Sequence, residues 1–134
     1  MSGIHPAELL LDTHALLWWL AEPDRLTPAA YGAIEDPGNR VHVSAASGWE
    51  IATKVRLGKL PVANELLEDL PEVLAAQGFQ LLPITLLHGM HAGGYKLEHR
   101  DPFDRLLAAQ AELSGLTLVS LDPALQAFPC RLLW

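Results

Sequence analysis

The stretch from Leu9 to Trp19 constrains the fold more than any other part of the chain. It opens with three consecutive leucines, a pattern typical of a strand buried on both faces of a parallel sheet. The apolar run breaks at Asp12 and then continues at helical length to Leu20. A carboxylate between a buried strand and a helix lies where open α/β sheets bind ligands. Asp12 is therefore a candidate site residue, although an aspartate before a helix is also an ordinary N-cap.

The composition describes one folded domain. A chain of 134 residues, 50% hydrophobic and 19% charged, is long enough to bury a core and is not disordered. The net charge of -7 argues against a broad basic surface for duplex DNA. Cys130 is the only cysteine, which excludes an intrachain disulfide and favours a reducing compartment. Because no stretch has the pattern of a signal peptide or a membrane span, we expect a soluble, cytoplasmic protein.

Strand and helix patterns alternate along the chain. We expect strands near residues 9–11, 41–44, 79–84, 116–120 and 130–133. Helices are expected over residues 13–20, 28–36, 45–57, 62–76, 85–93 and 102–114, with a helical turn over 123–127. This alternation predicts a single α/β domain with a parallel sheet of about five strands and helices on both faces. We expect residues 1–8 to be a short N-terminal extension and residues 9–134 to be the domain.

Acidic residues recur where strands end or helices begin. The candidates are Asp12, Glu50, Asp104 and Asp122, with Asp101 as an alternative to Asp104. In a parallel sheet with right-handed crossovers, the carboxyl ends of all strands lie at one edge, so these positions converge. Neighbouring carboxylates repel one another unless a cation neutralises them, and a set of oxygen ligands selects Mg²⁺ or Mn²⁺. Such an ion can activate water and stabilise the charge that develops on a phosphodiester.

Each of these acids also has a purely structural interpretation. Glu50 stands four residues before Lys54, so the two can form a solvated pair on a helix. Asp101 precedes a proline and resembles an N-cap, which makes Asp104, in the first helical turn, the better candidate ligand. Asp122 precedes a proline in the same way, and a cap is an equally good interpretation of it.

Four stretches resemble the motifs of PIN-domain ribonucleases, specifically the VapC-type toxins of toxin–antitoxin pairs. In chain order they are Leu10–Trp18, Ser44–Lys54, His99–Ala111 and Leu118–Asp122. The resemblance implies Mg²⁺- or Mn²⁺-dependent cleavage of RNA, inhibition by a VapB-like antitoxin, and a homodimer. It carries the acidic residues of the family over to Asp12, Glu50, Asp104 and Asp122. We expect Asp12 and Asp104 to be the metal ligands, with Glu50 and Asp122 completing the site.

Other functional residues and surfaces are less sharply defined. A phosphate-contacting rim and ordinary solvated charge are both open for the basic residues that flank the acidic motifs: Lys54, Arg56, Lys59, Arg100 and Arg105. Trp18, Trp19 and Trp49 are expected in the core. The apolar face of the helix expected over residues 62–76 is wider than one sheet face needs. We therefore expect it, with the first helix and the helix over 45–57, to form the surface for self-association and for the antitoxin.

Two other functions are compatible with part of this pattern. A phosphoryl-accepting receiver-like signalling domain shares the size, the parallel sheet and an acidic Mg²⁺ pocket. Such a domain usually has an acidic pair after the first strand and an acceptor aspartate after the third. This chain has Asp12 alone at the first place and Pro83-Ile84 at the second. A non-catalytic PIN-fold interaction module is the other alternative, and retention of all four acids argues against it.

Overall fold

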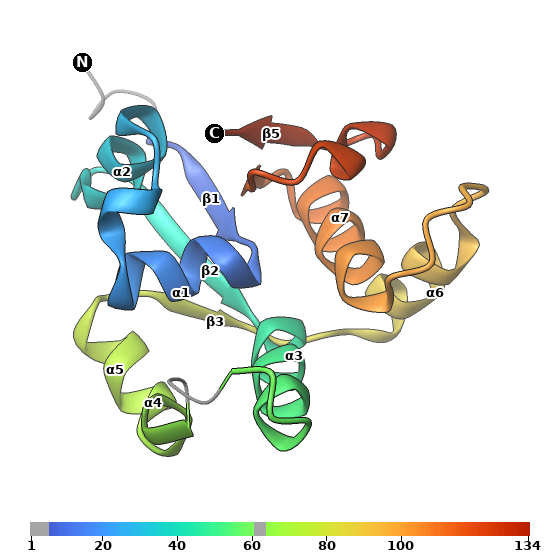
Figure 1. Ribbon diagram of the computed structural model, residues 1–134. Helices are drawn as coiled ribbons and strands as arrows, with labels where there is room; N and C mark the ends of the chain where they lie inside the picture. Colours follow the sequence, from blue (N-terminus) through green and yellow to red (C-terminus); the bar gives the residue numbers. More distant parts are fainter. Residues whose placement is uncertain (1–5, 61–63) are drawn as a thin grey trace.

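The computed structural model describes residues 6–60 and 64–134. Five parallel strands form one sheet in the order β3-β2-β1-β4-β5. The strands are β1 (Glu8–Leu11), β2 (Arg40–Ser44), β3 (Gln80–Leu82), β4 (Thr117–Val119) and β5 (Arg131–Leu133). From β1 the chain builds the sheet outward to β3, and it then returns to the other side of β1 with β4 and β5 (Figure 1). The strand order therefore reverses between β1 and β4, and such a switch point is where open α/β sheets bind ligands.

The leucines of β1 divide between two cores because side chains alternate across a strand. Leu9 and Leu11 pack with α1 (Thr13–Ala21), α2 (Pro28–Glu35) and α5 (Leu70–Ala76). Leu10 packs with α7 (Pro102–Ser114) in a second cluster. Figure 1 shows α1 and α2 on one side of the strands and α7 with α6 (Leu86–Gly94) on the other. The predicted sheet of five parallel strands with helices on both faces is confirmed.

Polar caps set the starts of the helices at the carboxyl edge of the sheet. The helix α3 (Ala45–Arg56) begins directly after β2, and the Ser44 hydroxyl accepts a hydrogen bond from Ala46 N at 3.0 Å. At the far end of α7, Gly115 takes a left-handed conformation with φ of 66°, which glycine adopts without a Cβ clash. The described residues also form two short 3₁₀ turns, η1 (Pro23–Arg25) and η3 (Pro123–Ala127). Within the described residues, no helix is long and apolar enough to cross a membrane.

The helix expected over residues 62–76 is wrong, because the described part of this stretch forms two helices. They are α4 (Asn64–Glu68) and α5, and residues 62–63 lie outside the described residues. Pro71 stands in the first turn of α5, where its missing N–H cannot continue a helix from the preceding residues.

On this stretch, the apolar face that the sequence predicts is divided between buried and half-buried side chains. Leu70 and Leu74 are buried, and Leu66 and Leu67 pack partly against the first core. The most exposed large apolar side chains of the described residues lie elsewhere, above all on α6, where Leu86 is 82% exposed.

Candidate active site

Asp12 lies at the switch point of the sheet, between β1 and α1. Its backbone N–H donates to Val119 O of β4 at 3.1 Å, and its Oδ1 caps α1 by accepting from Ala15 N at 2.7 Å. Asp12 is 7% exposed. Burial raises the pKa of Asp12, while hydrogen bonds from Ser120 and Ala15 oppose that shift. The side chain is therefore both a helix cap and a buried carboxylate at the ligand-binding edge.

Glu50 lies in the second turn of α3 and is also buried, at 7% exposure. Its Oε2 forms an ion pair with Lys54 Nζ at 2.8 Å, so the helix pair expected from the spacing is present. The negative charge of Glu50 also acts on Asp12 and adds to the rise in its pKa. These two interpretations of Glu50 do not compete, because one carboxylate takes part in both interactions.

The two aspartates at the start of α7 have different surroundings. Asp101 is the N-cap, and its Oδ1 accepts from Phe103 N at 2.9 Å and from Asp104 N at 3.3 Å. Asp104 stands one turn on, and its Oδ2 contacts His99 Nε2 at 2.9 Å. Burial raises the pKa of Asp104 to about 6, and the charges of Asp101 and Asp122 add to this rise. The cap at Asp101 leaves Asp104 as the better candidate ligand, as the sequence indicates.

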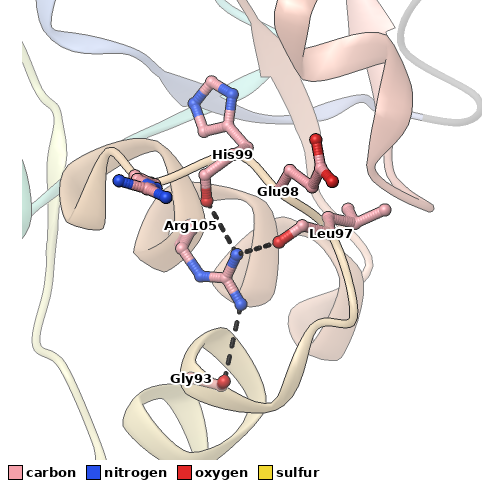
Figure 2. A pocket seen from close by; sticks show the side chains of 6 residues that line it. Gly93, Leu97, Glu98, His99 and Arg105 are labelled. Atoms are coloured by element: carbon pink, nitrogen blue, oxygen red, sulfur yellow. Dashed lines mark hydrogen bonds between the residues drawn. The ribbon is translucent and has the colours of Figure 1, made fainter.

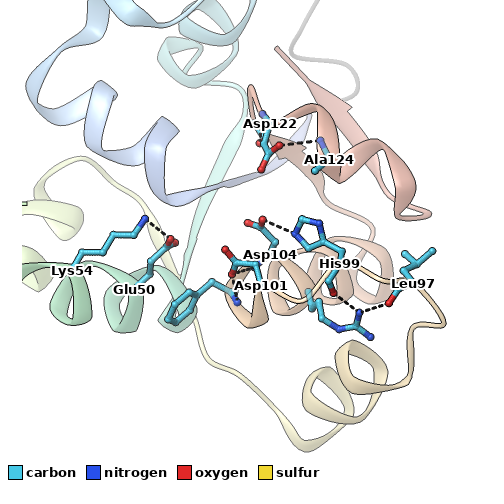
Figure 3. A network of polar contacts seen from close by, with 11 residues as sticks. Glu50, Lys54, Leu97, His99, Asp101, Asp104, Asp122 and Ala124 are labelled. Atoms are coloured by element: carbon cyan, nitrogen blue, oxygen red, sulfur yellow. Dashed lines mark hydrogen bonds and ion pairs between the residues drawn. The ribbon is translucent and has the colours of Figure 1, made fainter. Parts of the chain in front are cut away.

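Asp122 follows β4 and caps η3, with its Oδ1 accepting from Ala124 N at 2.9 Å. It is exposed, and its charge acts on Asp104. Figure 3 shows Glu50, Asp104 and Asp122 at the same edge of the molecule, although they come from three separate parts of the chain.

The four predicted acids can be treated as two pairs according to the charges that act on them. Glu50 adds to the rise in the pKa of Asp12, and Asp122, together with the cap Asp101, adds to the rise in the pKa of Asp104. Across residues 6–60 and 64–134, no three histidine, cysteine or acidic side chains are gathered as a ready-made metal cage. Mg²⁺ does not need one, because it keeps several waters and usually binds one or two carboxylates. Carboxylates at one edge, two of them buried and two with raised pKa values, fit a hydrated divalent cation of this kind.

Arg105 does not belong to a phosphate-contacting rim. Its guanidinium donates to the carbonyl oxygens of residues in the connection between α6 and α7, namely Ala92, Gly93, Tyr95, Leu97 and His99. Lys54 is likewise paired with Glu50. The interpretation of Arg105 as a phosphate contact is therefore wrong, because its hydrogen-bonding capacity is taken up by the backbone.

His99 is the residue at this site whose role sequence reasoning missed. It comes from the connection between α6 and α7 and contacts Asp104 across the start of α7. A histidine five residues before an aspartate, in an irregular segment, has no periodicity that would predict the contact. The backbone of His99 is held by Arg105, whose Nη1 donates to His99 O at 2.8 Å, and no sequence pattern marks such a contact.

Trp49 was expected in the core, and this is wrong. It is 54% exposed and packs edge-on against Phe103, with the ring centroids 4.7 Å apart. Trp18 and Trp19 are half-buried against the first core, as expected.

Two further histidines take part in local contacts. His88 accepts from Thr85 N at the start of α6, and His91 pairs with Glu112 of α7.

A family model described as the PIN domain matches residues 9–129. The chain belongs to the PIN-domain family. Membership of this family excludes the receiver-like alternative. It agrees with the five-stranded parallel sheet and with the position of Asp12 at the switch point of that sheet.

The chain is also similar to named relatives and to solved structures. It is 33% identical over 120 residues to Ribonuclease VapC22 of Mycobacterium tuberculosis, covering 89% of this chain and 90% of that protein. Its fold is similar to that in the crystal structure of VapBC2 from Rickettsia felis bound to a promoter DNA fragment. That likeness has a TM-score of 0.72 and 16% identity over 95% of this chain and 98% of the other. A second similar structure is FitAcB from Neisseria gonorrhoeae, with a TM-score of 0.57 and 23% identity over 94% and 96% of the two chains.

Proposed function

We propose that this PIN-domain protein is a Mg²⁺- or Mn²⁺-dependent endoribonuclease that acts as the toxin of a toxin–antitoxin pair. The observation that carries the proposal is the set of carboxylates where elements meet at the switch point of the sheet: Asp12 and Glu50 are buried, and the pKa values of Asp12 and Asp104 are raised. The relation to Ribonuclease VapC22 along 89% of the chain supports RNA as the substrate.

The acids take different parts in this proposal. Asp12 and Asp104 would hold the cation, one from each pair, and Glu50 and Asp122 would complete the site. When bound, a divalent ion supplies an activated water and stabilises the charge that builds on a phosphodiester. The buried position of Asp12 and Glu50 keeps bulk water away from one side of the edge, which strengthens their interaction with a cation.

The proposal includes an antitoxin related to those of the VapBC2 and FitAcB complexes. A cavity of about 330 Å³ lies between α1, Leu60 and α4, lined mainly by apolar side chains such as Leu17, Trp18 and Leu66. It lies within the surface that the sequence indicates for the partner. Ala21→Arg would fill this cavity from an exposed position, so we expect loss of copurification with the antitoxin and normal RNA cleavage. Unchanged copurification would place the antitoxin elsewhere.

We also propose a homodimer, and we assign its surface to α6 rather than to the stretch expected from the sequence. Leu86, Leu87 and Met90 are 82%, 66% and 65% exposed on this one helix. An apolar group of this kind is typical of an interface. Sedimentation should show a dimer for the wild type and a monomer for the double variant Leu86→Glu/Leu87→Glu, whereas a monomeric wild type would contradict the proposal.

The experiment that tests the nuclease function uses purified protein, total RNA and millimolar Mn²⁺, with and without EDTA. We expect cleavage that EDTA abolishes and that Asp12→Asn also abolishes. Asn caps helices as well as Asp does, so this variant keeps α1 while it removes the charge. A folded wild type that leaves RNA intact at every Mn²⁺ concentration would favour the non-catalytic interaction module instead.

A further inference from the structure

One side chain, Arg105, makes five hydrogen bonds to the end of α6 and to the connection between α6 and α7, residues 95–101. Arg105 Nε donates to Ala92 O at 2.8 Å, and its Nη atoms reach four more carbonyl oxygens at 2.6 to 3.4 Å. Ala92 and Gly93 belong to the last turn of α6, where carbonyls lack helical partners and a cation is favourable. Figure 2 shows the guanidinium enclosed by Gly93, Leu97 and His99. Arg105 therefore closes α6 and folds the connection back onto α7.

His99 is held by contacts from its backbone and from its side chain. Its backbone oxygen accepts from Arg105 Nη1 at 2.8 Å. Its ring packs edge-on against Phe128, with the ring centroids 5.4 Å apart, and its Nε2 lies 2.9 Å from Asp104 Oδ2. The side chains of His99 and Asp104 are only 20% and 19% exposed. These three contacts together hold the His99 ring beside the Asp104 carboxylate.

The partner of His99 Nε2 indicates which ring nitrogen carries the hydrogen. An ionised carboxylate only accepts hydrogen bonds, so Nε2 of His99 carries the hydrogen and donates it to Oδ2. Among the hydrogen bonds of the described residues, none involves Oδ1 of Asp104. The histidine thus engages one carboxylate oxygen and leaves the other for a ligand.

We propose that His99 is a positioning residue for the nuclease: it orients the Asp104 carboxylate for the cation, and Arg105 holds His99 in place. This inference rests on the proposed metal-dependent function. Carboxylates that bind metals are themselves hydrogen-bonded, and loss of such a partner costs about 10–100-fold in metal affinity or activity.

The test measures Mn²⁺ affinity of the full chain from the rise in melting temperature as Mn²⁺ is added. His99→Ala should weaken apparent affinity about 10–100-fold. His99→Gln keeps an amide N–H donor at a similar reach and should lose only a few-fold, whereas the shorter His99→Asn should behave like His99→Ala. RNA cleavage by His99→Ala should recover as Mn²⁺ is raised. A residue that only stabilised the connection would lower the melting temperature of the metal-free protein and leave the Mn²⁺ affinity unchanged.

His91 of α6 provides a matched control, since it also pairs with a carboxylate, that of Glu112 in α7. His91→Ala should keep the Mn²⁺ affinity of the wild type. Equal affinity for wild type and His99→Ala, or equal weakening of His99→Gln and His99→Asn, would overturn the positioning role while the nuclease proposal stands. If His99→Ala does not fold, the comparison of the Gln and Asn variants decides. A wild type without any response to Mn²⁺ would overturn both proposals.

Discussion

The two acidic pairs of the site are built in different ways. Asp12 and Glu50 are each 7% exposed, and they are held by regular elements, the end of β1 and the second turn of α3. Asp104 is only partly buried and Asp122 is exposed. Their positions depend on an irregular connection and a short 3₁₀ turn. The first pair is therefore fixed by the packing of the sheet, whereas the second is fixed by a few specific hydrogen bonds.

Because of this difference, changes near the two pairs should affect the stability of the fold to different extents. The first pair shares its supports with the two hydrophobic cores, so changes around it will be felt by the whole domain. The second pair is supported by Arg105 and His99, whose contacts lie outside the sheet. Variants of the second region can therefore alter ligand binding without unfolding the sheet, which makes the comparison testable.

The largest effect should come from removing one charge from each pair. We expect Asp12→Asn and Asp104→Asn each to reduce RNA cleavage by at least about 100-fold, a loss beyond that of outer-shell changes. Both variants should fold, and without metal their melting temperatures should equal or exceed that of the wild type. The reason is that burial raises the pKa values of both carboxyls, so the charge is unfavourable in the folded state. Wild-type cleavage by either folded variant would show that the pair does not act as a site.

Loss of Arg105 should affect the second pair and the local fold together. Arg105→Met leaves several carbonyls without donors, and we expect a loss of about 2–4 kcal/mol in the free energy of unfolding. Arg105→Lys should recover only part of it, because an ammonium cannot reproduce the planar fork. Urea denaturation measures both values. Equal stability of the Lys variant and the wild type would mean that charge alone closes α6.

The pH dependence of stability should differ between wild type and Asp104→Asn. The pKa of Asp104 is raised from 3.8 to about 6 in the folded state, so the folded protein holds this proton more tightly than the unfolded chain. The resulting stabilisation is complete below about pH 4 and is lost as pH rises through about 6. Melting temperatures in EDTA at pH 5 and pH 7.5 should therefore fall more with pH for the wild type than for the variant. Parallel curves would contradict the raised pKa.

The smallest effect is expected at Asp101, the neighbour of Asp104 that serves as a cap. Asp101→Asn should cleave RNA almost normally, and Asp101→Ala should lose about 1 kcal/mol of stability through the missing cap. Both measurements use the same cleavage and urea assays. Complete inactivity of Asp101→Asn would make Asp101, rather than Asp104, the third acidic residue of the site.

The sequence predicts the regular part of this molecule well, for physical reasons that are visible in β1. A run of leucines with a following aspartate indicates a central strand, and the alternation of Leu9, Leu10 and Leu11 between two cores is the structural form of that pattern. The first acidic pair follows from the same logic, since it sits where regular elements begin. Local rules also separate Asp101 from Asp104 through the cap.

The irregular part could not be predicted in the same way. The contact between His99 and Asp104 depends on five hydrogen bonds from Arg105 to backbone carbonyls, and carbonyls carry no sequence signature. The break at Pro71 was visible in the sequence, but the leucine spacing on either side of it suggested one helix. The exposure of Trp49 depends on the tertiary position of α3, which a local pattern does not contain.

The ion pair between Lys54 and Glu50 means that the proposed cation would meet a carboxylate that is already partly neutralised. The ammonium lies 2.8 Å from Oε2, and an ionised carboxylate has further lone pairs to offer. A monovalent ion would bring no more charge to Glu50 than Lys54 already supplies, whereas a divalent ion would bring twice as much. At the proposed site, the lysine therefore favours doubly charged ions over singly charged ones.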